Sequence, residues 1–347
     1  MVLALAIGAC GAAIFLYFGL PLPYMLGALA ACLVAALARA PIARPRYISP
    51  PMRVVLGVAV GAAFTPDLAG RVGEMAVSLA FVVPFVIAIG ATGIPFFERV
   101  GKFDRTTAFY AAMPGGFNDM LAMGRDAGAD TRKLSLAHAT RILVIVFTVP
   151  FFLQISEGVV LGGAPVSAMQ IGQLGLADGL ILLAIGVFGW WGAKRLGVTG
   201  AAIIGPMVVS AVLHASGLVE AKVPRELINL AQLVLGAHAG CMFIGITLRE
   251  ITTTVAAGVG NALCLLVLTA VFTALVVELT GIDLASVLLA YSPGGQAEMN
   301  LMAVVLGTDV AYVALHHLLR LALVVVGSQI VFRHWFRRPP PAAADDD

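Results

Sequence analysis

The sequence predicts an all-α protein that crosses a lipid bilayer many times, and three observations lead to this fold class. Of its 347 residues, 60% are hydrophobic and only 12% are charged, whereas a soluble domain typically carries about 25% charged residues. Several uncharged apolar runs approach the length of about 20 residues that a helix needs to cross a bilayer. The chain also matches itself when it is shifted by 179 positions, which places Pro114 on Pro293. We therefore expect two copies of one membrane unit.

The two copies agree at residue types that unrelated apolar segments seldom share. The Pro-Gly-Gly triplet at 114–116 falls on the triplet at 293–295, and the His-x-x-Arg pattern at 138–141 falls on the pattern at 317–320. Internal repeats of this size in a membrane chain are typical of transporters. The predicted organisation is a first repeat at 1–154, a connector at 155–177, a second repeat at 178–338 and a disordered tail at 339–347.

Each copy contains five long apolar runs, and we expect each run to form one helix. The runs lie at 2–18, 21–38, 52–66, 75–97 and 134–154 in the first copy, and at 178–193, 198–216, 226–247, 253–279 and 310–332 in the second. The first run lacks the positively charged start of a cleaved signal peptide, so we expect it to be retained as a helix. A shorter segment with the Pro-Gly-Gly triplet lies between the fourth and fifth runs of each copy.

These two shorter segments, about 106–124 and 285–304, are predicted to enter the membrane and return to the side they came from. Proline ends the incoming helix because its ring clashes with the preceding turn and it has no N–H to donate. The two glycines then permit the turn and a close approach of the backbone. Such irregular backbone is tolerated at membrane depth where protein surrounds it or where it lines a cavity. The alternative is that both segments cross the membrane, which would give twelve spans and two parallel copies.

The distribution of basic residues favours the re-entrant interpretation, because cytoplasmic loops are enriched in Lys and Arg. If the segments return and the N-terminus is cytoplasmic, only Arg71, Lys222 and Arg225 of the 21 Lys and Arg residues lie outside. Arg141 and Arg320 lie within the membrane, and the other 16 are cytoplasmic. The crossing alternative places 12 inside and 7 outside. We therefore expect two inverted repeats of five transmembrane helices, each with a re-entrant hairpin between its fourth and fifth spans, and both termini in the cytoplasm.

Candidate binding residues lie at the two turns and on the helices that follow them. The outgoing helices should start near Phe117 and Gln296, and a helix N-terminus offers free N–H groups and a positive dipole end to an anion. We expect no catalytic residue and no metal ligand. The candidate substrate- or ion-binding residues are Gly115, Gly116, Asn118, Asp119, Arg141, Gly294, Gly295, Gln296, Glu298, Asn300 and Arg320.

The charged candidates also have structural interpretations. Asp119 and Glu298 could bind a substrate or a coupling ion, or they could stabilise the dipoles of the outgoing helices. Arg141 and Arg320 could hold an anion through the planar guanidinium group. Alternatively, each arginine could pair with the acid of its own hairpin and pin that hairpin in place.

Two further pairs of residues recur in the copies. His138 and His317 could relay protons, because histidine titrates near neutral pH, or they could form hydrogen bonds inside the bundle. Asp130 and Asp309 each follow a Gly-x step and precede a helix, so both are predicted to cap that helix at its N-terminus.

The repeated motifs "PGGFNDM" and "PGGQAEM", each followed by Gly-x-Asp and a His-x-x-Arg helix, resemble the AbrB family of duplicated bacterial inner-membrane proteins. Members of that family carry labels such as ammonia monooxygenase or regulator of gene expression, and they are distinct from the small soluble DNA-binding regulator of the same name. The predicted architecture is also similar to that of the glutamate/sodium and 2-hydroxycarboxylate symporters, although their GGxG pattern is missing here. The resemblance implies a multi-pass protein of the bacterial inner membrane.

A secondary transporter of a small, anionic organic solute is the function that these features favour, with alternating access around a midplane site and coupling to H⁺ or Na⁺. The alternatives are a membrane protein that regulates gene expression and the monooxygenase of the family label. That enzyme would need a cluster of metal ligands, and the six histidines are scattered along the chain. We expect no cofactor and no nucleic-acid partner. The expected partners are the substrate, its coupling ion and the bilayer, and a homodimer stays open.

Overall fold

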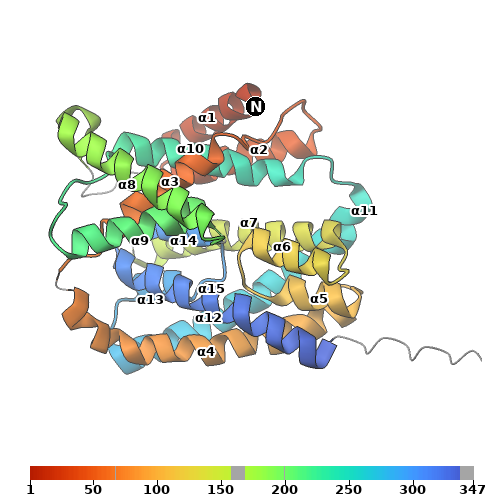
Figure 1. Ribbon diagram of the computed structural model, residues 1–347. Helices are drawn as coiled ribbons and strands as arrows, with labels where there is room; N and C mark the ends of the chain where they lie inside the picture. Colours follow the sequence, from red (N-terminus) through yellow and green to blue (C-terminus); the bar gives the residue numbers. More distant parts are fainter. Residues whose placement is uncertain (67, 158–168, 199, 337–347) are drawn as a thin grey trace, which may run out of the picture.

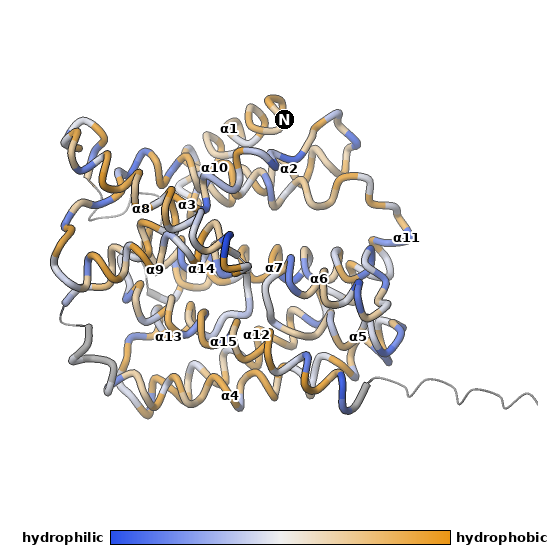
Figure 2. Tube along the Cα trace, viewed as in Figure 1, coloured by the Kyte–Doolittle hydropathy of each residue, from blue (hydrophilic) through white to orange (hydrophobic). Residues whose placement is uncertain are grey.

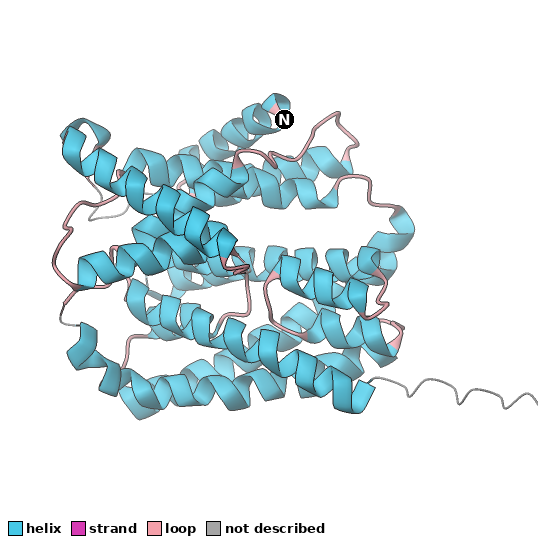
Figure 3. Ribbon diagram, in the orientation of Figure 1, coloured by secondary structure: helices cyan, strands magenta, loops and turns pink. Residues whose placement is uncertain are grey.

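The computed structural model describes residues 1–66, 68–157, 169–198 and 200–336, and within these ranges every regular element is helical (Figures 1 and 3). The predicted all-α class is therefore confirmed for the part of the chain that the structure describes. The tail predicted to be disordered at 339–347 lies outside the described residues, as does most of the predicted connector.

Six helices are long and apolar enough to cross a membrane, so the chain is a multi-pass membrane protein. Figure 2 shows hydrophobic residues along most of α4, whereas hydrophilic residues gather around the ends of α5, α6 and α11. The six are α4 (Leu68–Arg99), α7 (Thr131–Glu157), α8 (Leu176–Arg195), α10 (Arg225–Gly240), α12 (Ala256–Thr280) and α15 (Val310–Val331).

Each of the ten predicted runs contains a helix, but four of these helices are not among the six that are long enough to cross a membrane. They are α1 (Val2–Tyr17), α2 (Ala28–Leu37) with the preceding turn η1 (Pro23–Gly27), α3 (Ser49–Gly61) and α9 (Ala201–Ala215). The helical segment formed by η1 and α2 begins at Pro23, because proline has no N–H to bond to a preceding turn. The number of spans therefore stays a prediction, since the short helices do not meet the length of a full crossing on their own.

The helices pack in two groups. The first helix group contains α1, α2, α3, α8, α9 and α10, and the second contains α4–α7 and α12–α15. In Figure 1, α1, α2 and α10 lie at the top of the view and α4, α12 and α13 at the bottom. Contacts between the groups are made by α14 and α15 against α3, and by α7 against η3 (Cys241–Phe243). Both Pro-Gly-Gly turns belong to the second group.

Within the first helix group, helices from the two halves of the chain pack against each other. α3 packs on α9, and α10 packs on α2 and η1. A Cβ atom at Gly57 or Gly61 would collide with the backbone of α9, and one at Gly236 or Gly240 would collide with the backbone of η1 and α2. These four glycines let the helix backbones approach closely, as small residues do at membrane helix interfaces.

Each Pro-Gly-Gly turn connects two short helices. α5 (Arg105–Ala112) leads into the first turn and α6 (Phe117–Asp126) leaves it, and α13 (Leu284–Tyr291) and α14 (Gln296–Leu306) flank the second turn. The predicted helix starts near Phe117 and Gln296 are confirmed. The reason is local: the incoming helix cannot continue through proline, and the N-cap glycine in each triplet adopts extended backbone before the next helix begins.

The bases of both helix pairs are closed by the same set of hydrogen bonds. Asp104 caps α5 by accepting from the Thr107 amide at 3.0 Å, and Asp283 caps α13 by accepting from the Ser286 amide at 2.8 Å. The Thr107 hydroxyl also accepts a hydrogen bond from the backbone amide of Asp130, just before α7, at 2.8 Å. The Ser286 hydroxyl accepts the equivalent bond from the amide of Asp309, just before α15, at 3.0 Å.

The predicted caps Asp130 and Asp309 are confirmed. Asp130 Oδ1 accepts from the amides of Arg132 and Lys133 at 3.0 Å, and Asp309 Oδ1 accepts from the Tyr312 amide at 3.0 Å. Both carboxylates thus satisfy N–H groups that the first turn of a helix cannot pair internally. The helices that carry Arg141 and Arg320 are therefore anchored at their starts in the same way.

Candidate functional site

Two buried arginines hold the ends of the incoming short helices. Arg141 Nη1 donates to the Met113 carbonyl at 3.0 Å, and Arg320 Nη1 donates to the Ser292 carbonyl at 2.9 Å. Both carbonyls belong to the residue immediately before the proline. The last carbonyls of a helix lack intrahelical partners, and a cation there also interacts favourably with the helix dipole. The arginines lie 28 residues after their acceptors in both halves.

These hydrogen bonds fit the interpretation that each arginine pins its turn, with a backbone carbonyl as the partner. Among the described residues, the ion pairs that the structure shows do not join Arg141 or Arg320 to Asp119 or Glu298. Both acids occupy the third position of an outgoing helix and fold back over the N-cap glycine of the triplet, where a Cβ atom would collide with their carboxylates. This placement puts a negative charge in the first turn of each outgoing helix, where it interacts favourably with the helix dipole.

Each turn also lies against the arginine-bearing helix of the other half. A Cβ atom at Gly116 would lie 3.5 Å from Cδ1 of Leu321 in α15, and one at Gly294 would lie 3.2 Å from Cγ2 of Ile145 in α7. The structure thus brings both triplets and both arginines into one region of the second helix group.

Methionine side chains fill the space beneath the two turns. Met120 packs under Gly115 and Met299 packs under Gly294, and a Cβ atom on either glycine would come within 3.0 Å of the methionine side chain. The flexible thioether fits such irregular space. The predicted need for glycine at these two positions is thus explained by close packing as well as by the turn itself.

The two equivalent histidines differ. His317 is held on both ring nitrogens: Nδ1 accepts from Arg320 Nη2 at 2.6 Å, and Nε2 donates to the Leu289 carbonyl at 3.1 Å. Arginine can only donate and a carbonyl can only accept, so these partners select the neutral tautomer with the proton on Nε2. His138 is fully buried, but neither ring nitrogen forms a hydrogen bond within the described chain, although the Tyr110 carbonyl lies nearby. The hydrogen-bonding interpretation fits His317.

The amide candidates are placed differently from one another. Asn118 lies on the exposed side of α6. Asn300 is fully buried in α14, and within the described residues its side-chain nitrogen and oxygen both lack hydrogen-bond partners, as does Gln296 Nε2. Arg141 Nε is also buried without a partner. Because an unpaired buried polar group costs free energy, Asn300, Gln296 and Arg141 mark the part of this region best suited to a polar ligand.

A buried polar cluster in the second helix group was not predicted from the sequence. Ser78 Oγ contacts the Tyr312 hydroxyl and His316 Nε2, the latter at 2.8 Å, and the Tyr291 hydroxyl donates to the Ser78 carbonyl at 2.5 Å. The cluster joins α4, α13 and α15. Its only sequence signal was the His316-His317 pair, because Ser78 is more than 200 residues away along the chain and stands in an apolar run.

Comparison with known proteins gives a family but no solved structure. The family described as "Transition state regulatory protein AbrB" matches residues 24–336. "Uncharacterized protein YhjN" of Bacillus subtilis (strain 168) is 25% identical, with 92% of this chain and 89% of that protein covered. "Putative regulator AbrB" of Escherichia coli (strain K12) is 23% identical, with 92% of this chain and 91% of that protein covered. No solved structure matches.

Proposed function

The chain belongs to the AbrB family, and from this premise we propose that it is a secondary transporter that moves a small organic anion across the bacterial inner membrane. Its site would be the region where the two Pro-Gly-Gly turns meet Arg141 and Arg320. The coupling ion would be H⁺ or Na⁺. The names of the family and of the Escherichia coli relative speak of a regulator, and an effect on gene expression would follow indirectly from the movement of a metabolite.

The observation that carries the proposal is a pair of buried positive charges for which the described part of the chain provides no ion-pair partner. Arg141 and Arg320 are 3% and 4% exposed, and their hydrogen bonds go to backbone carbonyls and to His317. Arginine stays protonated in proteins, and a charge at the centre of a membrane helix costs roughly 2.5–3.5 kcal/mol on insertion scales. A bound anion would supply the missing countercharge. Its charge would also suit the N-termini of α6 and α14.

The topology that accompanies this proposal is two inverted repeats with re-entrant hairpins, at 1–154 and 178–338, in ten spans with both termini cytoplasmic. Its support is the recurrence of whole contacts at a constant offset. The Arg141–Met113 and Arg320–Ser292 hydrogen bonds are equivalent at a shift of 179 positions. The caps of α5 and α13 and the glycines of α3 and α10 recur at the same shift, and the backbone partners of these glycines recur at a shift of 178.

Alternating access would come from movement of the second helix group against the first. The first group is tied together by the exchanged packing of α3 on α9 and α10 on α2, whereas the second carries both turns. Contacts between the groups involve few elements, mainly α3 with α14 and α15. We propose that the second group carries the anion and that the first stays fixed in the bilayer.

Uptake into proteoliposomes tests the function. A panel of radiolabelled small mono- and dicarboxylates would be offered under an inward H⁺ or Na⁺ gradient. We expect at least one to accumulate. We also expect Arg141→Lys and Arg320→Lys to weaken its uptake about tenfold or more, since hydrogen bonds to charged groups are worth about 1.5–3 kcal/mol and lysine lacks the guanidinium fork.

The matched control is Arg195→Lys, because Arg195 is an exposed arginine at the end of α8 that stacks on Trp191. Its variant should transport as the wild type does. Equal uptake by the control and by both buried-arginine variants would show that the two arginines do not hold the substrate.

A further inference from the structure

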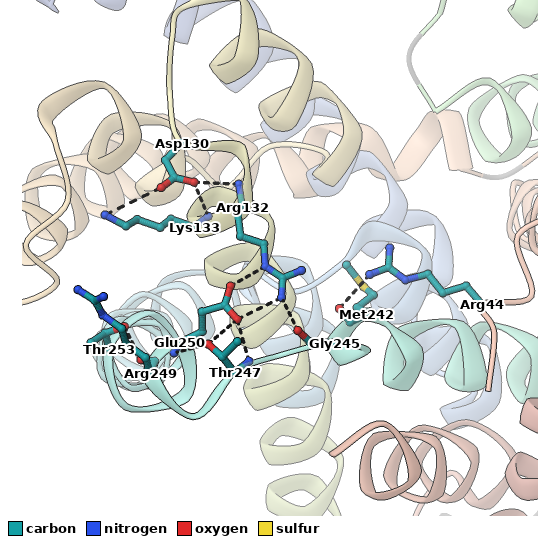
Figure 4. A network of polar contacts seen from close by, with 10 residues as sticks. All are labelled: Arg44, Asp130, Arg132, Lys133, Met242, Gly245, Thr247, Arg249, Glu250 and Thr253. Carbon is teal, nitrogen blue, oxygen red and sulfur yellow. Dashed lines mark hydrogen bonds and ion pairs between the residues drawn. The ribbon is translucent and has the colours of Figure 1, made fainter. Parts of the chain in front are cut away.

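A pocket rich in positive charge lies apart from the two Pro-Gly-Gly turns, where three segments of the chain meet. Its volume is about 360 Å³. The segments are the loop between α4 and α5, the start of α7, and the stretch formed by α11 (Leu248–Glu250) and η4 (Ile251–Val255). The first two segments come from the first half of the chain and the third from the second half. Figure 4 shows the polar side chains around this pocket.

The acidic side chains of the pocket are already used by local hydrogen bonds. Asp130 caps α7, as described above. Glu250 Oε1 accepts from Arg132 Nε at 2.6 Å, and its Oε2 accepts from Arg132 Nη2 at 3.2 Å and from the Thr247 amide at 2.8 Å. Both carboxylates therefore serve the starts of helices, Glu250 also pairs with Arg132, and Asp130 forms a long, exposed ion pair with Lys133.

Three basic side chains line the pocket besides Arg132, namely Lys102, Lys133 and Arg249. Within the described residues, Lys102 and Arg249 form no ion pair or side-chain hydrogen bond. Lys133 Nζ lies 4.0 Å from Asp130 Oδ2 and 5.5 Å from the centre of the Phe103 ring. The side chains of Lys133 and Arg249 point to the same side of the view in Figure 4. The lining of the pocket thus combines four basic side chains, Arg132 among them, with the buried apolar side chains of Phe103 and Leu136.

We infer that this pocket binds a phosphate ester. A phosphate group has several acceptor oxygens for the ammonium groups of Lys102 and Lys133 and for the Arg249 guanidinium, which matches phosphate geometry. The apolar floor suits the carbon skeleton attached to it. The pocket lies at the ends of membrane helices, where a phospholipid headgroup lies, and a soluble phosphorylated metabolite has the same chemistry. This inference does not depend on the transport function.

The site adjoins a connection between the two helix groups. Arg132 Nη2 donates to the Gly245 carbonyl at 3.1 Å, and Arg44 from the other group donates to the carbonyls of Cys241 and Met242 at 3.0 and 2.9 Å. The segment from Cys241 to Thr247 is therefore held by an arginine at each end (Figure 4). A phosphate ester bound in the pocket would hold together the α4–α5 loop, the start of α7 and α11, next to the hydrogen bond between Arg132 and Gly245.

Ligand-dependent thermal unfolding of the purified full-length protein tests the inference. The probes are phosphatidylglycerol, sn-glycerol 3-phosphate, and phosphatidylcholine, whose choline group neutralises its phosphate. A ligand that binds only the folded state raises the unfolding midpoint according to its concentration relative to Kd. We expect phosphatidylglycerol or glycerol 3-phosphate, but not phosphatidylcholine, to raise the midpoint. We expect Lys102→Gln/Arg249→Gln to bind about tenfold more weakly because two charge-assisted contacts are lost.

Lys194→Gln is the matched control, because Lys194 is an exposed lysine at the end of α8, outside the pocket, and has no ion pair with any described residue. If the double variant without ligand unfolds at a lower temperature than the wild type, the two single variants are used instead. Native mass spectrometry then counts the phosphatidylglycerol molecules bound to each. A shift with the lipid alone identifies a headgroup site, and a shift with the soluble ester as well identifies a metabolite site. The absence of any shift, or equal shifts in Lys194→Gln and the pocket variants, would overturn the inference.

Discussion

Individual residues at equivalent positions of the two halves carry much of the local structure, and their partners are mostly backbone groups. Arg141 and Arg320 donate to the carbonyls before the two prolines, and Asp104 and Asp283 cap the helices that lead to these turns. Such bonds supply partners for N–H and C=O groups that helix ends leave unpaired. A single substitution at one of these positions should therefore act on one turn or one helix end.

Asp104 should stabilise the protein in a way that depends on pH. Burial raises the pKa of the Asp104 carboxyl group, whereas hydrogen bonds from the Thr107 side chain and from backbone amides lower it. The hydrogen bonds together outweigh burial, so the pKa lies below its usual value. The stabilisation is then present above the pKa of the unfolded chain and is lost as the pH falls through the lower pKa of the folded state.

We expect Asp104→Ala to cost about 0.5–2 kcal/mol at neutral pH, as loss of an N-cap does. Asp104→Asn keeps an acceptor and should cost less. Thermal unfolding midpoints measured at neutral pH and below about pH 4 check both points. A gap between wild type and Asp104→Asn that does not shrink in acid would contradict this account.

The two recurring histidines should respond differently to the same substitution. His317→Leu removes the partners of the Leu289 carbonyl and of Arg320 Nη2, and should cost about 1–3 kcal/mol because buried groups are left unpaired. His138→Leu removes a ring whose nitrogens have no partner within the described chain, so it should cost less or even stabilise. Thermal unfolding of the two variants makes the comparison, and an equal loss would show that His138 is bonded in the folded protein.

At the scale of helices and turns, proline, glycine and the caps define where each short helix begins and ends. The chain leaves one helix at Met113 or Ser292 and starts the next at Phe117 or Gln296. These boundaries follow from proline at the next position and from an extended glycine at the N-cap. These boundaries do not determine the side of the membrane from which each Pro-Gly-Gly turn is accessible to water.

Single cysteines at Phe117 and Gln296 decide that question after the four native cysteines are replaced. If the two helix pairs are re-entrant and opposed, a membrane-impermeant thiol reagent should reach the cysteine at 117 mainly from the cytoplasm and the cysteine at 296 mainly from outside. A cysteine at Leu196, an exposed residue after α8, serves as the cytoplasmic reference. Labelling of both positions from one side would favour the parallel twelve-span alternative.

At the scale of the whole molecule, the two halves are joined by exchange of helices. α3 of the first half lies against α9 of the second, and α10 of the second lies against α2 of the first. Neither half could bury its glycine-bearing surface alone, so the first helix group needs the complete chain. This arrangement also brings the two turns of the second group to a common region between α7 and α15.

Alanine at the exchanged contacts should destabilise the whole protein. Gly57→Ala and Gly236→Ala place a Cβ atom against the carbonyls of Ile203 and Met25, which are backbone atoms that cannot move aside easily. We expect each to cost about 1–3 kcal/mol, as overpacking does. Gly192→Ala in α8 is the control, since no atom lies within 4 Å of its Cβ position, and it should be neutral or stabilise the helix by up to about 1 kcal/mol. Equal unfolding midpoints for all three would contradict the close packing.

The sequence alone determined the features that depend on neighbouring residues: the membrane class, the helical runs, the starts of α6 and α14, and the caps Asp130 and Asp309. Helix ends are decided within about four residues by proline, glycine and capping side chains, so they can be predicted locally. The tertiary structure decided the partners of Arg141 and Arg320, the burial of Asn300 and the Ser78–His316 contact, whose members are 238 residues apart. It also decided the charged pocket and the exchange of α3 and α10. These features depend on which helices pack together, and a single apolar pattern is compatible with many ways of packing.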